Sequence, residues 1–278
     1  MLLTTLTIAA QSNISIKRSR EHLKCNHRGI RRCVRIDISS PDIGHDIDSL
    51  RLVFVTDTHY ASRFTSKTLA SLGRMLRELK PDAILLGGDY QEGCQYVDPL
   101  FSEIMTAQPQ YGAFAVLGNN DKERCTDLIL QSMQQHGITF IEDTLNILNI
   151  SNSRLVIMGA RNTFGRKENT PPPTSPEVQD SDFVMLITHT PDYVEDQSQA
   201  CSKVDFSVAG HLHGGQVTLF GLYAPVLPSH YGQRFRHGIK YTTNHLPILC
   251  SNGIGTSRMA IRFCAAPEIH LIVLHSEK

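Results

Sequence analysis

Tryptophan is absent from this sequence of 278 residues, and so is any excess of charge of one sign. Lys and Arg together number 27, and Asp and Glu also number 27, so the formal net charge is zero. Proteins that bind nucleic acids usually carry a basic footprint, so we expect no nucleic-acid partner. No apolar run reaches the roughly 20 residues that a membrane-spanning helix needs. Hydrophobic residues still make up 41% of the chain, which is enough for a packed core and excludes a wholly disordered protein.

The seven cysteines are odd in number and lack the paired spacing of a zinc site. An apolar run at residues 1–10 precedes the first positive charges, whereas a secretory signal has its positive charge before the apolar part. We therefore expect a reduced, cytoplasmic protein with ordinary buried thiols and no cleaved signal.

The N-terminal part of the chain is strongly basic. Between Lys17 and Arg35 there are eight Lys or Arg residues and one acid, Glu21. The preferred interpretation is a solvated tail; contact with an anionic membrane surface and a transit peptide are the alternatives. We expect residues 1–40 to form a poorly ordered basic segment that can make peripheral contact with a membrane, and residues 41–278 to form one domain.

Strands and helices alternate in the first half of the chain, and strands dominate the second half. Apolar runs at residues 51–56, 83–86 and 113–117 predict buried strands. A leucine repeat at 69, 72, 76 and 79 predicts a helix that begins near Thr65 or Ser66. A second helix is expected from about Lys122 to the pair His136-Gly137.

Later apolar runs predict further strands at residues 155–158, 183–188, 205–209 and 268–274. Residues 168–181 are rich in proline and read as a surface loop within the domain. Together these elements predict an α/β fold in which sheets pack between helices.

Polar side chains that can bind metals follow five of the predicted strands. They are Asp57 and His59, then Asp89, then Asn119, Asn120 and Asp121, then His189, and finally His211 and His213. In open α/β sheets, ligands bind where the carboxyl ends of the strands meet, so these residues are expected to converge. Oxygen and imidazole donors without cysteine suit Mn, Fe, Co or Zn. Two Asp, one Asn and four His from this set make seven donors, which are too many for one tetrahedral site and fit two metals that share a carboxylate, as in hydrolases that act on phosphorus.

The series Asp57-x-His59, Gly88-Asp89, Gly118-Asn119-x-Asp121, His189 and Gly210-His211-x-His213 resembles the motif blocks of the calcineurin-like metallophosphoesterases, in the family's order. The segments that follow, at residues 213–216, 252–257, 261–263 and 267–269, are similar to the branch of YaeI/YkuE-like bacterial phosphodiesterases. The match runs from about residue 51 to the C-terminus, so residues 41–278 would be the metallophosphoesterase domain.

This resemblance implies a four-layer α/β/β/α sandwich with two divalent metal ions, of Mn, Fe, Zn or Co, with Mn favoured. One ion would be held by Asp57, His59 and His213, and the other by Asn119, His189 and His211. Asp89 would bridge them, and a bridging water or hydroxide would attack phosphorus. The catalytic residues would be Asn120, Asp121 and His59.

One position departs from the family. The family usually has histidine where this chain has Asn120, and that histidine helps the leaving group or stabilises the phosphate. A neutral amide can donate a hydrogen bond to phosphate but cannot supply a proton near neutral pH. The departure favours diester, activated-ester or pyrophosphate substrates over simple alkyl monoesters.

The sequence therefore predicts a dinuclear metal-dependent phosphoesterase that hydrolyses phosphodiester or pyrophosphate bonds. An alternative is a UDP-2,3-diacylglucosamine hydrolase of lipid A synthesis, whose nucleotide-lipid substrate would explain a basic segment beside a membrane. A non-catalytic scaffold on the same fold is less favoured, because all seven ligand positions are filled.

Overall fold

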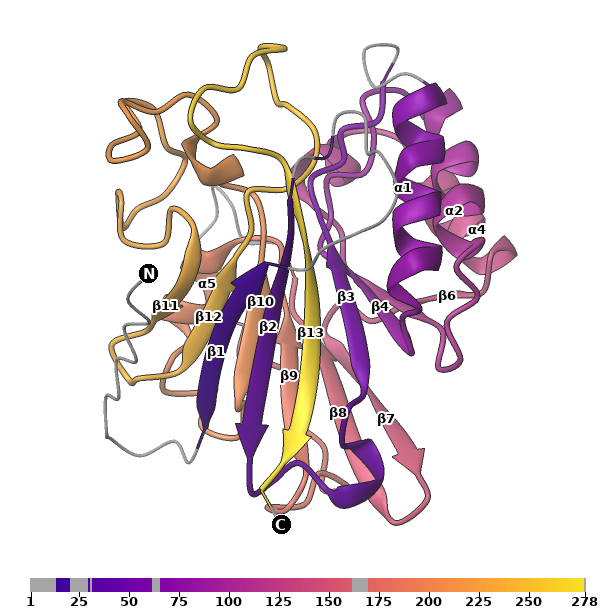
Figure 1. Cartoon of the computed structure of the whole chain (residues 1–278), viewed down its shortest axis with the longest axis vertical. Coiled ribbons are helices and arrows are strands. Elements are labelled where there is room, and N and C mark those ends of the chain that lie inside the picture. Colours follow the sequence, from indigo (N-terminus) through magenta and orange to yellow (C-terminus); the bar gives the residue numbers. More distant parts are fainter. Residues whose placement is uncertain (1–13, 21–29, 31, 62–65, 162–169, 278) are drawn as a thin grey trace.

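The computed structural model describes residues 14–20, 30, 32–61, 66–161 and 170–277. Two β-sheets pack face to face, and helices cover their outer faces (Figure 1). The first sheet has the order β1-β2-β13-β3-β4-β5-β6. Its strands are β1 (Ser15–Arg20), β2 (Arg32–Ser40), β3 (Arg51–Val55), β4 (Ala83–Leu86), β5 (Ala113–Ala115), β6 (Ile138–Phe140) and β13 (Glu268–Ser276).

The second sheet has the order β11-β12-β10-β9-β8-β7. Its strands are β7 (Thr144–Ile150), β8 (Ser153–Gly159), β9 (Phe183–Ile187), β10 (Phe206–Ala209), β11 (Gly238–Tyr241) and β12 (Pro247–Cys250). Strands β8, β9, β10 and β12 run parallel, and so do β3, β4, β5 and β6 in the first sheet. The carboxyl ends of these strands carry the loops of interest.

Helices α1 (Ser66–Leu79), α2 (Val97–Met105) and α4 (Thr126–Gln135) cover the outer face of the first sheet (Figure 1). The short helix α5 (Pro191–Asp196) packs on the outer face of the second. The predicted leucine face of α1 is buried as expected, and each buried leucine contributes about 1.5–3 kcal/mol. A separate apolar cluster fills the space between the sheets. The predicted four-layer α/β/β/α fold is confirmed.

The sheet begins earlier in the chain than the sequence analysis predicts. Strand β1 pairs with β2, and β2 lies beside β13 along nine residues. Val34, Ile36 and Ile38 of β2 are buried, with charged residues between them. This alternation is the pattern of a half-buried strand, which the count of basic residues obscured. The boundary at residue 40 is therefore wrong, and the domain includes β1 and β2; residues 1–13 and 21–29 lie outside the described residues.

The helix predicted from Lys122 to His136 is divided. Helix α3 (Asn119–Glu123) ends before α4 begins, and Cys125 between them has a φ of 65°. A left-handed residue interrupts the regular helical backbone, so the chain changes direction there. Gly137, with a φ of 68°, follows the end of α4 as predicted.

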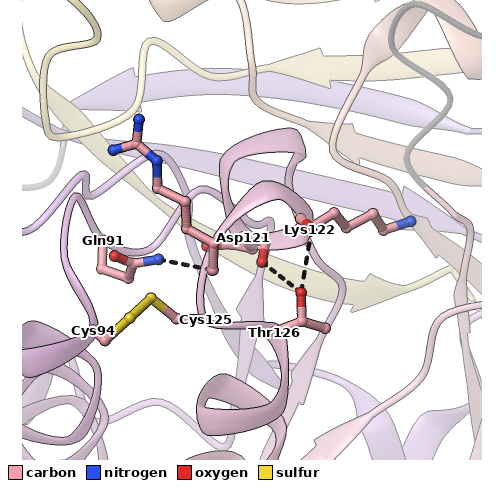
Figure 2. The surroundings of a disulfide bond; sticks show 7 residues. Gln91, Cys94, Asp121, Lys122, Cys125 and Thr126 are labelled. Carbon is pink, nitrogen blue, oxygen red and sulfur yellow. Dashed lines mark hydrogen bonds between the residues drawn. A yellow bond between two sulfur atoms is a disulfide. The ribbon is translucent and has the colours of Figure 1, made fainter.

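Cys125 forms a disulfide with Cys94, 31 residues away in sequence (Figure 2). The prediction of reduced thiols is wrong for this pair, because the fold brings the loop after β4 and the α3–α4 junction to a Cα–Cα distance of 5.5 Å. Cys33, Cys201 and Cys250 are buried as expected, and the last two are free thiols. In the described part of the chain, no helix combines the length and the apolar character needed to cross a bilayer.

Candidate metal centre

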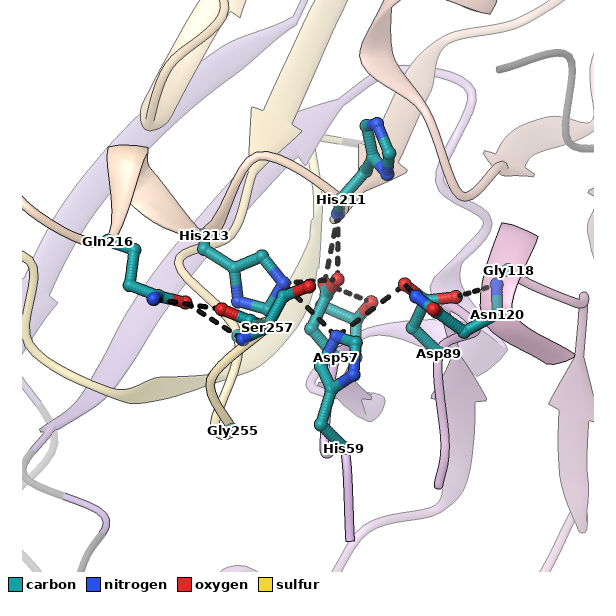
Figure 3. A network of polar contacts seen from close by, with 12 residues as sticks. Asp57, His59, Asp89, Gly118, Asn120, His211, His213, Gln216, Gly255 and Ser257 are labelled. Atoms are coloured by element: carbon teal, nitrogen blue, oxygen red, sulfur yellow. Dashed lines mark hydrogen bonds and ion pairs between the residues drawn. The ribbon is translucent and has the colours of Figure 1, made fainter. Parts of the chain in front are cut away.

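The seven predicted metal ligands all lie at one end of the two sheets. Asp57 and His59 follow β3, Asp89 follows β4, Asn119 opens α3 after β5, His189 follows β9, and His211 and His213 follow β10. Parallel strands that end at the same edge bring these loops together (Figure 3). The two Asp and four His side chains are buried.

The backbone is strained where these side chains turn inward. Five of the seven predicted ligands have positive φ: Asp57 (52°), His59 (40°), Asp89 (54°), His211 (67°) and His213 (51°). A residue other than glycine in this region costs about 1–3 kcal/mol, and such residues cluster at functional sites. The sharp turns let consecutive loops direct their side chains to one point.

Two glycines let the backbone approach the carboxylates. A Cβ atom on Gly118 would lie 2.0 Å from Asp89 Oδ1, and one on Gly210 would lie 2.1 Å from Asp57 Oδ2. Any side chain at these positions would displace a carboxylate. The backbone amide of His211 also lies 3.1 Å from Asp57 Oδ1 and 3.0 Å from Oδ2. The glycines therefore shape the site without contributing a side chain.

Asp57, His59 and His213 form the first triad, with ligand atoms within 4.8 Å of one another. The Nε2 atoms of the two histidines are 3.1 Å apart, and Asp57 Oδ1 is 3.5 Å from His213 Nε2. Such a spacing between two imidazole nitrogens and a carboxylate suits a shared cation.

Charged side chains support the first triad from outside. His59 Nδ1 donates a hydrogen bond to Glu92 Oε1 over 2.6 Å, which leaves Nε2 as the free lone pair. Burial alone would lower the pKa of His59, but Glu92 and Asp89 raise it above its ordinary value. Arg262 lies with Nη2 3.1 Å from His213 Nδ1. Burial, with His59 and Arg262 nearby, holds the pKa of His213 well below its ordinary value.

Asp89, His189 and His211 form the second triad, again within 4.8 Å. His189 Nε2 lies 3.2 Å from His211 Nδ1, and His189 Nδ1 donates to the Gly87 carbonyl over 2.7 Å. Burial opposes protonation of His189, but the Asp89 carboxylate raises its pKa to about 9. Burial and the neighbouring His189 lower the pKa of His211 to about 3.

Asp89 lies between the triads. Its Oδ2 is 3.5 Å from His59 Nε2 in the first triad and 3.4 Å from His189 Nε2 in the second. Burial would raise the pKa of Asp89, but His189, His59 and His211 outweigh it and hold the carboxyl ionised. One carboxylate thus faces both sets of donors.

Residues 119–121 take three different positions. Asn119 Oδ1 is buried and has no hydrogen-bond partner among the described residues, so this oxygen is available as a ligand atom. Asn120 donates to both Asp89 oxygens, from its backbone amide over 2.9 Å and from its side chain over 2.6 Å (Figure 3). Its predicted contact with phosphate stays a prediction, and in this structure the amide orients Asp89.

The buried carboxylate of Asp121 binds backbone amides. Its carboxylate accepts hydrogen bonds from the backbone amides of Gly118, Asp89 and Tyr90, over 2.7–2.9 Å. Burial and the nearby Asp89 raise the pKa of Asp121 to about 7. These bonds join the loops after β4 and β5, which is a positioning role; the catalytic role predicted for Asp121 stays a prediction.

The donor set fits two divalent cations. Four imidazoles, two carboxylates and an orphaned amide oxygen are gathered in a buried site where unpaired polar atoms are costly. Nitrogen and oxygen donors of this kind suit Mn, Fe, Co or Zn.

A cavity of about 1050 Å³ opens beside the first triad. His59 and Glu92 form one side, and Arg258 and Arg262 contribute positive charge. Phe220 adds an apolar surface. The cavity thus places cationic and apolar groups next to the predicted metal ligands.

Two residues of the site, Glu92 and Arg262, were not predicted from the sequence. Glu92 stands three residues after Asp89, and an acid so close to a metal-ligand motif is the available signal for a carboxylate that supports histidine. Arg262 belongs to a quoted motif, but only the fold shows that it reaches His213.

Comparison with known proteins agrees with this geometry. The family model for calcineurin-like phosphoesterases matches residues 50–215. The metallophosphoesterase YkuE of Bacillus subtilis is 27% identical over 247 residues, which cover 86% of this chain and 84% of YkuE. The phosphodiesterase YaeI of Escherichia coli is 27% identical over 231 residues, covering 81% of this chain and 82% of YaeI.

Among solved structures, TT1561 of Thermus thermophilus aligns with a TM-score of 0.49 at 9% identity, over 74% of this chain and 90% of that one. The family match covers more than half of the sequence, and it includes the loops that carry both triads. The chain therefore belongs to the calcineurin-like phosphoesterases, a family of metal-dependent phosphoric ester hydrolases, as its motif blocks predicted.

Proposed function

We propose that this protein is a dinuclear metal-dependent hydrolase of phosphodiester or pyrophosphate bonds. The observation that supports two ions is the position of Asp89, whose Oδ2 lies 3.5 Å from a histidine of one triad and 3.4 Å from a histidine of the other. A carboxylate in that position is suited to bridging.

In this proposal Asp57, His59 and His213 hold one ion, and Asn119, His189 and His211 hold the other. Two divalent ions, with Mn favoured over Fe, Zn or Co, would neutralise phosphate charge and lower the pKa of bound water. The protein's part is to fix the ligands. Glu92 accepts a hydrogen bond from Nδ1–H of His59, and the Gly87 carbonyl accepts one from Nδ1–H of His189, so Nε2 of each histidine is available to a metal.

The substrate class follows from the leaving group. Asn120 has no proton to give near neutral pH. Glu92 is the acidic residue among the described residues that line the cavity, and it already accepts a hydrogen bond from His59. General acid catalysis is worth about 10²–10⁴-fold, so its absence disfavours alkoxide leaving groups. Diesters with activated leaving groups and pyrophosphates need it least, and YaeI is named as a phosphodiesterase.

A second candidate is the hydrolysis of UDP-2,3-diacylglucosamine. The cavity of about 1050 Å³ is at the upper end of the size of ligand sites, and it combines arginines with Phe220 and Ile254. A nucleotide-lipid needs both kinds of surface.

The test is turnover by protein reconstituted with Mn²⁺. We expect hydrolysis of bis(p-nitrophenyl) phosphate with two ions per chain, and far slower hydrolysis of alkyl monoesters. Asn120→His should raise the rate most for alkyl substrates. Each tenfold gain in rate corresponds to about 1.4 kcal/mol of activation free energy. Equal rates on aryl and alkyl substrates by the unmodified protein would show that another residue supplies the proton. Release of UMP from UDP-diacylglucosamine would select the second candidate.

A further inference from the structure

Exposed apolar side chains gather on two segments beside the cavity. Most of the large hydrophobic residues that are exposed in the described chain lie at residues 219–226 and 259–263. We call them the apolar rim: Leu219, Phe220, Leu222, Tyr223, Val226, Met259, Ile261 and Phe263. Phe220 is 85% exposed, Leu222 81% and Val226 78%. Scattered apolar residues are common on surfaces, but a concentration on neighbouring loops marks a contact surface.

The two segments are joined to each other. The backbone amide of Phe263 donates to the Gln216 carbonyl over 2.8 Å, and that of Thr218 donates to the Phe263 carbonyl over 3.0 Å. The side chain of Gln216 also donates to the Met259 carbonyl over 3.0 Å. In Figure 1 these are the orange and yellow loops above the sheets. The apolar rim is therefore carried by one joined pair of loops.

The tip of the first segment is built to present its side chains. Leu219 pairs with Tyr223 in a short hairpin, and Phe220 at its tip has a φ of 53°. A bulky residue in the left-handed region is strained, and strain of this kind is kept where function needs it. Arg236 is buried and donates to the carbonyls of Gly214 and Gly221, which fixes the hairpin next to the turn that carries His213.

The charge of the two segments is one-sided. Residues 216–237 and 251–267 contain no Asp or Glu and four arginines, of which Arg236 is buried and Arg234 pairs with Glu195 over 2.9 Å. Arg258 is exposed and lines the cavity, next to the rim residue Met259. A second copy docking through the same surface would bring the exposed Arg258 of both copies into one interface without an acid from these segments to pair with them, which disfavours self-association. Arginines beside exposed apolar side chains complement a bilayer with anionic headgroups.

We propose that the apolar rim docks this protein on an anionic phospholipid bilayer. Phe220, Leu222 and Val226 enter the boundary between headgroups and acyl chains, and Arg258 pairs with lipid phosphate. Phe220 and Arg258 also line the cavity, so the docked molecule opens its cavity toward the bilayer. That last consequence rests on the proposed function, whereas binding to lipid does not.

The experiment is co-sedimentation of the full chain with vesicles in the absence of substrate. Vesicles of phosphatidylcholine containing phosphatidylglycerol should bind the protein, and phosphatidylcholine alone should bind it much more weakly. The double variant Leu222→Ser/Val226→Ser should lose at least about tenfold in affinity. The matched control is Leu128→Ser, since Leu128 is 49% exposed on α4, away from the rim, and should bind as the unmodified protein does. Arg258→Glu should abolish the preference for anionic vesicles.

Hydrolysis of soluble bis(p-nitrophenyl) phosphate separates this proposal from the proposed function. Leu222 and Val226 are not among the cavity-lining residues, so the double variant should keep that activity and its metal content. Two results would overturn the proposal: vesicle binding by the double variant equal to that of the unmodified protein, which would assign binding to the basic N-terminal part, or no binding by the unmodified protein. A dimer in light scattering that the double variant converts to a monomer would also overturn it, and would assign the rim to a second copy.

Discussion

The two triads differ in what holds their histidines. In the second triad, His189 donates to a backbone carbonyl, that of Gly87, whose own amide is bonded to Val55 of β3. In the first triad, His59 donates to the side chain of Glu92, which is 33% exposed and borders the cavity. A backbone acceptor is fixed by the sheet, whereas a side chain must itself be ordered. The second triad is thus built into the fold, and the first depends on replaceable groups at the cavity wall.

The largest effect is expected from removing Asp89, the carboxylate that faces histidines of both triads. Asp89→Ala should cost both ions, and activity should fall at least about 10²–10³-fold, the size found for loss of a principal electrostatic group. Metal content and kcat/KM on the aryl diester measure this. A variant that keeps both ions and normal turnover would refute the shared role of Asp89.

Weakening the support of the first triad should affect only one ion. Glu92→Gln keeps the shape but weakens the acceptor for His59, and such changes typically cost about 10–100-fold in metal affinity or activity. We expect one ion to dissociate at lower chelator concentration while the other is unchanged. Glu177→Gln, at an exposed loop position, is the control for the loss of one negative charge. Equal weakening of both ions would contradict the distinction between the triads.

Low pH should weaken metal binding at the second triad. The pKa of His189 is raised to about 9 by Asp89, so His189 carries a proton at neutral pH in the metal-free protein. A histidine ligand must be neutral, so each ion bound there displaces a proton, and affinity should rise with pH up to about 9. Calorimetry in buffers of different ionisation enthalpy measures the released proton. Binding without proton release near neutral pH would show that His189 is already neutral.

Removing the disulfide should lower the free energy of unfolding and should change catalytic activity less than the substitutions above. Cys94–Cys125 closes a loop of 31 residues, and Cys94 lies two positions after Glu92 in the chain. The double variant Cys94→Ser/Cys125→Ser should lose about 3–4 kcal/mol of unfolding free energy. Any loss of metal should fall on the first triad. Denaturant unfolding with and without reductant measures the first effect, and an unchanged midpoint would count against it.

The sequence predicted well what depends on local pattern. Apolar runs located β3, β4, β9 and β10, and the polar residues after them located the loops that converge. The predictions from sequence failed where a residue or strand contacts a partner that is distant in the chain. Strand β2 is recognised as an interior strand of the sheet only because the C-terminal strand β13 pairs with it, 236 positions later at Glu268 and Arg32. The Cys94–Cys125 bond and the reach of Arg262 to His213 likewise depend on how loops are packed, which spacing alone does not encode.

The site shows the same limit. The sequence marked Asp121 as a candidate catalytic residue, but the three backbone amides that donate to its carboxylate are visible only in the fold. Asn120 was identified as unusual from sequence, yet its contact with Asp89 required the structure.

The most direct test of the account is a crystal structure of the Mn²⁺-loaded protein with anomalous scattering measured at the manganese edge. We expect two peaks about 3.5–4 Å apart, with Asp89 in contact with both. One peak should be bordered by Asp57, His59 and His213, and the other by Asn119, His189 and His211. A single peak, or two peaks with Asp89 touching neither, would contradict it.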